Sequence, residues 1–343
     1  MSDIAGREPP SPGQIFQTLR ALGLAEKYQG DPEKLAQWQG DFRRAFDQSY
    51  VEHPKMPWGY FKEGNAPSLG TAASGLSALL SLDLQPTLGA EARKMAAFLE
   101  GRRDLFGRYE PGLSPDRPAL LREEEDRETG LAQLALVEWY IATGEARLLP
   151  GLLKGFAHVQ RRVQAPEYDF PLPLMAWHLE ACAHLYRATR QEDIARFVFR
   201  FSDLIASSQD RKEETPEDCR GRFEIPLPEG GNAPPAAEAT GLYLQGLIQG
   251  LALAREVGDE RRLDRYREAV QWGLRALLQL QIRERYDTWC MPCPERAVGG
   301  FRAREDAALV RIEGQACAIA ALDQALAVLE EADYASTGQK ANE

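Results

Sequence analysis

The sequence predicts an all-α fold, a (α/α)6 toroid or barrel of antiparallel helical hairpins. Three observations lead to this prediction. Apolar residues recur at three- and four-residue intervals, as Leu131, Leu134, Val137 and Ile141 do, and no bounded run of strict alternation indicates a strand. Helices rich in small apolar residues alternate with more charged ones. Four of the apolar helices also begin near an acidic residue, which predicts carboxylates around one mouth of the toroid.

The predicted helices lie in one domain that spans residues 12–334. The residues before and after it, 1–11 and 335–343, are polar and rich in small or charged residues, and we expect disordered tails there. We expect almost no strand. The helices are predicted at 12–26, 32–49, 68–83, 87–104, 128–143, 146–164, 172–189, 191–209, 237–257, 259–283 and 312–333.

Short turns separate the two helices of each predicted pair. Gly144 and Gly258 suit the left-handed conformation that ends a helix. Asp259 and Thr189 can cap the helix that follows through their side-chain oxygens. Such short connections make the paired helices antiparallel. The connections on the other side are long and are expected to form the working face; they span 104–127, 210–236 and 284–304.

The charge pattern predicts which helix of each pair is buried. The segment 241–254 carries no charge, whereas 259–268 is mostly charged. A helix that is apolar all round is buried, and one with a polar face is peripheral. We therefore expect an inner and an outer ring of helices. The last hairpin lacks its outer helix, so a chain terminus is expected to pack there.

Composition excludes several classes of protein. The apolar content of 44% and charged content of 27% are those of a soluble globular protein, and the net charge of −11 argues against nucleic acid or an anionic membrane as partner. No run of about 18 apolar residues predicts a membrane span, and no secretory signal is visible. Five cysteines are too few and too scattered for a disulfide scaffold, which favours a cytoplasmic location. Cys290 and Cys293 form a CxxC without a second pair, so we predict no metal and no cofactor.

Two sets of motifs resemble branches of the α/α-toroid superfamily, and the resemblance covers residues 12–333. Gly299-Gly-Phe-Arg302 followed by Val310-Arg-Ile-Glu-Gly-Gln315 resembles the closing segment of carbohydrate-active members, which include glycoside hydrolases, uronyl hydrolases and sugar or uronyl epimerases. Pro57-Trp-Gly-Tyr60 before Thr71-Ala-Ala-Ser-Gly-Leu76 resembles the repeats of terpene cyclases and protein prenyltransferases. The outer helices that end in Gln160, Gln209 and Gln281 resemble them too.

The chain also departs from both branches. The acid motif of class II terpene cyclases is absent, and its nearest counterpart is Glu124-Glu-Asp126. No Asp, Cys and His set suggests the zinc site of prenyltransferases. The Trp-Ser-Arg-Gly-Gln-Ala-Trp signature of uronyl hydrolases is missing as well. The resemblance therefore implies a fold, and fold alone does not carry function across.

Glu128, Asp169, Glu238 and Glu313 are the candidate catalytic residues. Paired carboxylates with separated pKa values act as general acid and general base on a glycosidic bond, or move a proton beside a uronate carboxyl group. The simpler explanation is that each acid stabilises a helix N-terminus, where carboxylates are favoured by backbone N–H groups and the helix dipole. Recurrence favours catalysis, because Ser, Thr or Asn would cap equally well.

Aromatic and basic residues near these acids are candidates for substrate binding. Aromatic rings suit stacking on sugar rings, and arginines suit an anionic substrate such as a uronate. Packing and neutralisation of nearby acids explain the same residues without a ligand. The candidates are Trp58, Tyr60, Tyr168, Trp289, Arg302, Arg304 and Arg311.

The sequence thus predicts a carbohydrate-active enzyme, a hydrolase, lyase or sugar epimerase, that uses carboxylate acid/base chemistry in the toroid mouth. A small-molecule or oligosaccharide substrate, with uronic-acid-containing sugars as one hypothesis, is the expected partner. One alternative is a terpene-cyclase-like or prenyl-binding toroid, in which the acids are helix caps. Another is a non-catalytic module that binds a peptide or protein.

Overall fold

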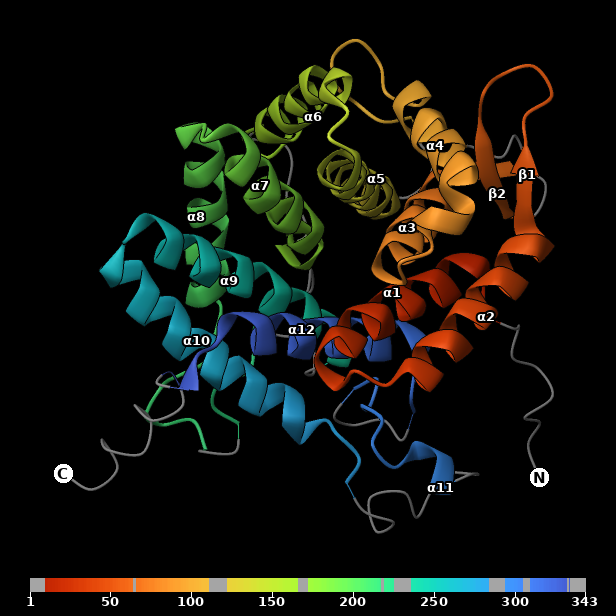
Figure 1. Ribbon diagram of the computed structural model, residues 1–343. Coiled ribbons are helices and arrows are strands. Elements are labelled where there is room, and N and C mark those ends of the chain that lie inside the picture. The colour runs from red at the N-terminus through yellow and green to blue at the C-terminus, as the bar shows by residue number, and fades with distance from the viewer. Residues whose placement is uncertain are drawn as a thin grey trace. The chain divides into compact units, whose positions relative to one another are not determined.

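The structure is a computed structural model that describes residues 10–63, 66–110, 122–165, 172–216, 219–224, 236–283, 294–304, 309–331 and 333 (Figure 1). The chain divides into two compact units, Met1–Glu145 and Ala146–Glu343. Each unit is described by itself below. The prediction of a single domain stays a prediction. Among the described helices, none has both the length and the hydropathy that crossing a membrane requires.

The first unit is built from two antiparallel helical pairs and one further long helix. Local capping explains where its first helices begin and end: Ser11 and Gln14 form a capping box, and Gly30 ends the first helix in the left-handed region. Asp31 then caps the second helix. The elements are α1 (Pro12–Gln29), α2 (Pro32–Ser49), β1 (Tyr50–Glu52), β2 (Gly59–Glu63), β3 (Ala66–Ser68), α3 (Leu69–Ser81), α4 (Gln85–Gly101) and α5 (Arg122–Thr143).

Helices α1, α3 and α5 are the inner helices of this unit, and they run parallel. Gln17 of α1 donates a hydrogen bond of 3.4 Å to Ser74 of α3. Near the start of α3, Gly70 packs against Glu128 of α5, and further along Ser77 donates to Glu138. Contacts that advance in the same direction on both helices place the N-terminal ends of α3 and α5 together.

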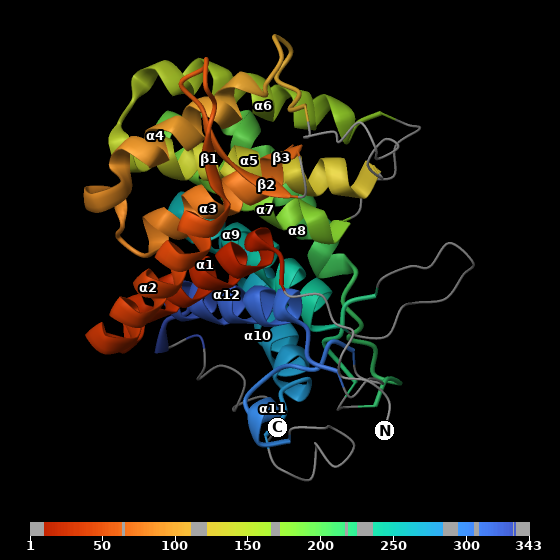
Figure 2. The same cartoon turned by 90° about the vertical axis from the view of Figure 1, so that its right-hand side faces the viewer.

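A small antiparallel sheet, in the order β1-β2-β3, packs against α3 and α4 (Figure 2). Tyr60 pairs with Val51, and Phe61 pairs with Ser68. Phe61 is fully buried, and an added Cβ on Gly75 of α3 would overlap its ring. The expectation of almost no strand missed this sheet because its strands are too short to show a clear two-residue period.

The second unit contains two more helical pairs and a last inner helix. Its elements are a 3-10 turn (Ala146–Leu148), α6 (Leu149–Arg162), a second 3-10 turn (Leu172–Leu174), α7 (Met175–Thr189), α8 (Glu192–Ser207), α9 (Ala237–Val257), α10 (Glu260–Gln279), α11 (Pro294–Ala297) and α12 (Ile312–Val328). Gly144 and Gly258 have positive φ and follow α5 and α9, as predicted. Asp259 caps α10, also as predicted, through a hydrogen bond from Arg262.

One predicted cap and one predicted helix start are wrong. Thr189 does not cap α8: it is the last residue of α7 and donates to the carbonyl of Leu185, while Arg190 takes the left-handed conformation. Helix α5 begins at Arg122, about a turn and a half before the predicted start at residue 128. The charged run Arg122–Glu128 is therefore the beginning of the helix and not a loop that leads into it.

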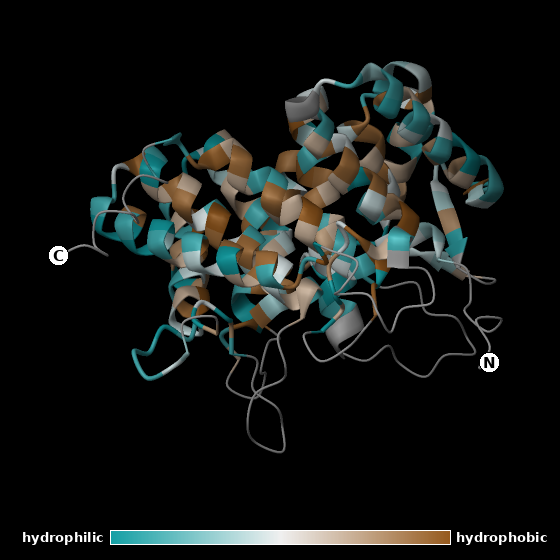
Figure 3. Cartoon of the chain, turned by 90° about the horizontal axis from the view of Figure 1, so that it is seen from below, coloured by the Kyte–Doolittle hydropathy of each residue, from teal (hydrophilic) through white to brown (hydrophobic). Residues whose placement is uncertain are grey.

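The inner helices α9 and α12 of the second unit also run parallel and in close contact. A Cβ added to Gly241 would lie 2.7 Å from the backbone carbonyl of Cys317. Further along, Gln249 donates 3.3 Å to Gln324. Helix α9 is buried along nearly its whole length, whereas α8 and α10 alternate between buried and exposed residues. Figure 3 shows hydrophobic and hydrophilic residues interleaved along the helices of the chain.

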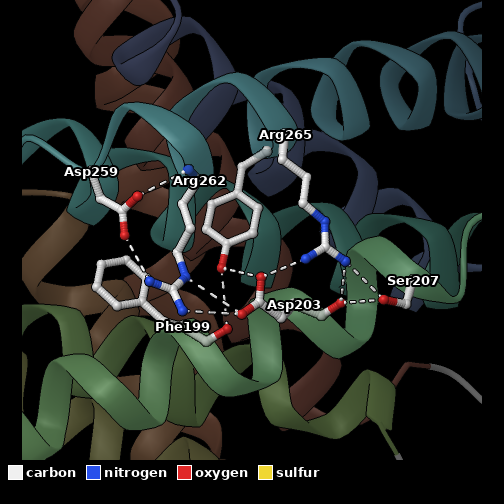
Figure 4. A network of polar contacts seen from close by, with 7 residues as sticks. Phe199, Asp203, Ser207, Asp259, Arg262 and Arg265 are labelled. Atoms are coloured by element: carbon white, nitrogen blue, oxygen red, sulfur yellow. Dashed lines mark hydrogen bonds and ion pairs between the residues drawn. The ribbon is translucent and has the colours of Figure 1, made fainter.

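An ion-pair network joins the neighbouring outer helices α8 and α10 (Figure 4). Asp203 accepts from Arg265 at 2.9 Å, and Tyr266 lies 3.0 Å from the same oxygen. Burial, and then the charge of Asp203, raises the pKa of Tyr266. Arg262 contacts Asp203 at 3.4 Å and Asp259 at 2.7 Å. The network stabilises the packing of the two outer helices.

Candidate active site

A recurring backbone feature precedes three of the inner helices. After each of α4, α8 and α10 the chain forms a single antiparallel β-bridge: Arg103 with Tyr109, Gln209 with Phe223, and Gln281 with Phe301. We call the three segments closed by these bridges the bridge loops. Their closing residues are similar, namely Gly107-Arg-Tyr-Glu110, Gly221-Arg-Phe-Glu224 and Gly299-Gly-Phe-Arg302. The chain then continues into α5, α9 and α12, the helices that carry Glu128, Glu238 and Glu313.

Glutamine side chains hold the second and third bridge loops. Gln209 donates to the carbonyls of Gly221 at 3.0 Å and Ala269 at 2.9 Å. Gly221 has φ of +91° and its Cα lies against the backbone of α10, so another residue would be strained and would clash there. Phe223 then stacks on Tyr243 of α9 at 4.8 Å, where burial raises the pKa of Tyr243 to about 12.

The third bridge loop is held from α12 itself. The side-chain amide of Gln315 accepts from the Phe301 N–H at 2.8 Å and donates to the Phe301 carbonyl at 2.7 Å. It therefore pairs with this residue as a neighbouring strand would. Gln281 donates to the Gly299 carbonyl at 3.2 Å, and the Phe301 side chain is buried. Gln315 thereby fixes the backbone just before Arg302.

The first bridge loop is held from α5. The Tyr109 hydroxyl donates to Gln133 at 3.0 Å, and both side chains are buried. Burial raises the pKa of Tyr109. Arg108 forms an ion pair of 3.1 Å with Glu125, in the first turn of α5. This bridge loop therefore lies at the N-terminal end of α5.

Glu238 and Glu313 occupy equivalent positions on neighbouring helices. Each is the second residue of its helix, α9 or α12. A Cβ on Gly314 would lie 3.4 Å from the Cβ of Ala237 and 3.7 Å from the backbone nitrogen of Glu238. The two acids therefore start from first turns that touch. Neither is an N-cap: those residues are Ala236 and Arg311, which make no side-chain cap bond.

The close approach of α9 and α12 leads to a prediction about Gly241. We expect Gly241→Ala to destabilise the protein by about 3 kcal/mol, because its methyl group would meet the Cys317 backbone, which cannot move as a side chain can. Thermal unfolding measures the effect. Gly40→Ala in α2 is the control: nothing lies within 4 Å of its added Cβ, so it is expected to stabilise slightly. Equal unfolding temperatures for the two variants would contradict the packing described.

Glu128 was predicted at the start of its helix but lies further inside it. It is in the second turn of α5, so it does not open the helix, and its side chain packs on Gly70 of α3. Asp126, one of the acids of the same charged run, is only 3% exposed. The N-terminal ends of α3 and α5 thus bring buried and half-buried acids together with Thr71, which is also buried. Asp169, Tyr168 and Trp289 lie outside the described residues, as do Cys290 and Cys293.

Trp58 and Tyr60 pack on the outer helix α4. The Trp58 ring lies edge-on to Phe98 at 5.9 Å, and an added Cβ on Gly101 would meet it. Tyr60 lies 5.3 Å from the same Phe98 ring. These contacts give both aromatics a packing role in the first unit. A role in substrate binding stays a prediction for them.

The three predicted arginines lie around the start of α12. Arg302 is half-buried and directly follows Phe301, whose backbone is hydrogen-bonded to Gln315. Arg304 is exposed, and Arg311 is the exposed N-cap residue of the helix. All three therefore lie close in the chain to Glu313 and at the same end of α12. This end of α12 therefore carries Glu313 and the three arginines in one stretch of the chain, next to the first turn of α9.

The sequence did not predict that Gln133 and Gln315 hold the bridge loops in place. The recurring Gly-Arg-Tyr-Glu and Gly-Arg-Phe-Glu were the signal that could have revealed the bridge loops. It also missed two grooves beside α8 on the outer helices, of about 490 and 350 Å³. Both grooves are lined by Asp203 and Arg262, which form an ion pair between α8 and α10. The charged residues of the grooves therefore have a role in helix packing. In the described part of the chain, no group of three His, Cys, Asp or Glu could hold a metal ion.

Comparison with known proteins shows the fold. No family model and no curated protein sequence matches the chain. Among solved structures, a glycosyl hydrolase of family 88 from Bacteroides vulgatus is 13% identical with a TM-score of 0.62, covering 93% of this chain and 92% of that one. Cellobiose 2-epimerase from Bacillus thermoamylovorans is 11% identical, TM-score 0.64, covering 91% and 87%. Protein geranylgeranyltransferase-I from Candida albicans is 13% identical, TM-score 0.54, covering 97% and 92%.

The chain therefore has the α/α-toroid fold, as the sequence predicted. Similar structures occur in both branches of the superfamily that the motifs resemble, the carbohydrate-active one and the prenyltransferase one. At these identities the likeness concerns the fold. Function must be argued from the residues.

Proposed function

We propose that this protein is a carbohydrate-active enzyme that uses paired carboxylates as general acid and general base. The observation that carries the proposal is the placement of Glu238 and Glu313 on touching first turns of the parallel helices α9 and α12. Glu128 and Asp169 are further proposed catalytic residues. A cytoplasmic location and the absence of nucleic-acid partners stay predictions.

The site offers chemistry that helix capping alone does not require. Two carboxyl groups near one substrate can divide the work, one donating a proton while the other accepts one. Those are the roles that cleavage of a glycosidic bond or epimerisation of a sugar needs. Arg302, Arg304 and Arg311 favour a substrate that carries a carboxylate, such as a uronic-acid-containing sugar.

The test compares Glu238→Gln and Glu313→Gln with the wild type on uronate and neutral disaccharides and on geranylgeranyl diphosphate. We expect turnover of one sugar class to fall at least about 100-fold in each variant, with folding retained in circular dichroism. Glu260→Gln is the matched control. It removes an acid from the first turn of the outer helix α10, so it repeats the loss of helix-dipole stabilisation without touching α9 or α12.

Other outcomes decide against the proposal. If both variants keep full turnover and only unfold earlier, as Glu260→Gln does, the acids stabilise helices and are not catalytic. If geranylgeranyl diphosphate raises the unfolding temperature of the wild type and no sugar does, the protein belongs functionally with the isoprenoid-binding toroids. That is the second candidate, supported by the geranylgeranyltransferase likeness.

A further inference from the structure

Three adjoining grooves on the outer helices of the second unit are lined by arginines. The largest, of about 490 Å³, lies between α8 and α10 and shares Asp203 and Arg262 with the groove of about 350 Å³. It shares Arg196 and Arg200 with a third groove, of about 180 Å³, that borders α6. We call this surface the arginine groove, after Arg196, Arg200, Arg261, Arg262 and Arg265.

Part of the charge in the arginine groove serves the packing of α8 on α10 (Figure 4). Asp203 pairs with Arg262 at 3.4 Å and with Arg265 at 2.9 Å. Asp259 pairs with Arg262 at 2.7 Å. Two carboxylates and two guanidinium groups balance each other in this network. What the groove offers to an anion must therefore come from its other arginines.

Arg200 is an arginine of the groove that no acid among the described residues pairs with. Its side chain is exposed, and its guanidinium carbon lies 5.5 Å from the centroid of the Phe201 ring. Arg196 lies one turn earlier on the same face of α8. Its ion pair with Glu192 is 3.6 Å long, between side chains that are 71% and 87% exposed. Such surface pairs contribute little, so Arg196 and Arg200 can turn to a ligand together.

The donors of the arginine groove favour carboxylates as ligands. Guanidinium groups bind carboxylates and phosphates through two parallel N–H groups. Phosphate sites commonly add backbone N–H groups at a helix start. At the start of α10, however, the Asp259 side chain already accepts from the Arg262 N–H at 3.1 Å. Arg196 and Arg200 lie inside α8, where backbone N–H groups bond within the helix. The groove thus offers side-chain donors alone.

The apolar part of the groove distinguishes a sugar acid from a protein partner. Leu204, one turn after Arg200, is 47% exposed. Phe199 is buried, with the Arg262 guanidinium 4.8 Å from its ring centroid. An amphipathic helix needs several apolar anchors, and a stable protein interface uses about 20–30 residues on each side. One exposed leucine offers neither. It suits the apolar C–H face of a sugar ring whose carboxylate reaches the arginines.

We propose that the arginine groove binds the carboxylate groups of a uronate-containing oligosaccharide, with Arg196 and Arg200 as the contact residues. The site lies on outer helices and does not include Glu238 or Glu313, which belong to the inner helices α9 and α12. It goes beyond the proposed function, because it holds an acidic carbohydrate whether or not those glutamates are catalytic.

The experiment measures binding of trigalacturonate by titration calorimetry at low salt, with maltotriose as the neutral probe. We expect wild type to bind trigalacturonate alone. Arg200→Ala is expected to raise Kd about 5-fold, and Arg200→Lys, which keeps the charge but not the paired donors, should give an intermediate Kd. Arg93→Ala is the control. It removes a 68% exposed arginine from the outer helix α4 of the first unit, and its Kd should match wild type.

Four outcomes would overturn this inference. If Arg200→Ala and Arg93→Ala bind with the same Kd, the ligand lies elsewhere. If wild type does not bind trigalacturonate, the groove is not a uronate site. Equal displacement by inorganic phosphate indicates a general anion site, and tighter binding of triglutamate with blocked ends, weakened by Arg200→Ala, indicates an acidic-peptide site. The proposed function is judged separately, by turnover in Glu238→Gln and Glu313→Gln.

Discussion

Replacing Asp333 with alanine is expected to lower the free energy of unfolding by about 3–5 kcal/mol. After α12 the chain returns to α9 and α10, where the Asp333 carboxylate, 4% exposed, pairs with Arg255 at 2.8 Å and Arg267 at 2.5 Å. Gln271 donates to the Asp333 carbonyl. Removing the Asp333 carboxylate takes the acidic partner from two partly buried guanidinium groups. Breaking a buried ion pair by removing one of its members is strongly destabilising. Urea unfolding at neutral pH measures the loss.

The control for this prediction uses the same arginine. Asp264 pairs with Arg267 at 2.7 Å, but its side chain is 72% exposed. Surface ion pairs contribute about 0–1 kcal/mol, so Asp264→Ala should cost at most about 1 kcal/mol. Similar losses for Asp264→Ala and Asp333→Ala would show that the Asp333 cluster is not the anchor of the C-terminal segment.

The Asp333 cluster also predicts how stability depends on pH. Burial raises the pKa of Asp333, but hydrogen bonds from the Glu330 N–H, Arg255 and Arg267 together outweigh it and hold the pKa below its ordinary value of 3.8. A lowered folded-state pKa stabilises the fold above the unfolded-state value, and this contribution is lost as pH falls through the folded-state value. The difference in stability between wild type and Asp333→Ala should therefore be full at pH 6 and shrink below about pH 4.

Replacing Arg20 with methionine is expected to cost a similar 3–5 kcal/mol. Arg20 of α1 pairs with Glu138 of α5 at 2.7 Å, with side chains 10% and 18% exposed, and Ser77 of α3 donates to the same carboxylate. Three parallel inner helices thus meet at one carboxylate. The single variant would take the guanidinium partner from the largely buried Glu138 side chain.

The matching test is a double-mutant cycle. Arg20→Met combined with Glu138→Leu should recover most of the loss, because two apolar side chains need no partner. Arg44→Met serves as the exposed control, since Arg44 is 72% exposed and pairs with Asp41 at the surface. If the double variant is as unstable as the sum of the single ones, packing and not charge explains the role of these residues.

The helical part of the fold was predictable because its signals are local. Gly258 and Asp259 mark the end of α9 and the start of α10 by backbone conformation and side-chain capping, both of which follow from residue type. The error at α5 arose where charge was read as a sign of a loop. Residues 122–128 are charged, yet Glu and Arg are good helix formers, and Asp126 becomes buried through packing that the sequence does not display.

The candidate site was predictable only in outline. The recurrence of an acid near the start of four apolar helices predicted Glu238 and Glu313 as catalytic residues, and contact between α9 and α12 brings their first turns together. Their catalytic role stays a prediction. Gln315 ends a motif that the sequence displays, but its role depends on the backbone of Phe301, 14 residues earlier, and residue type does not reveal that contact. The three bridge loops also differ greatly in length, so their shared closing residues do not form a regular sequence repeat.

Because the bridge loops differ in length, we expect them to tolerate insertions and substitutions. Each is closed at its base by one pair of backbone-bonded residues, so its two ends stay together whatever number of residues lies between them. Doubling the length of a loop adds only about 0.6 kcal/mol of closure entropy. Segments exchanged or lengthened between Gln209 and Gly221 should thus leave the bridge in place, which makes the toroid a scaffold on which new recognition surfaces can be grafted.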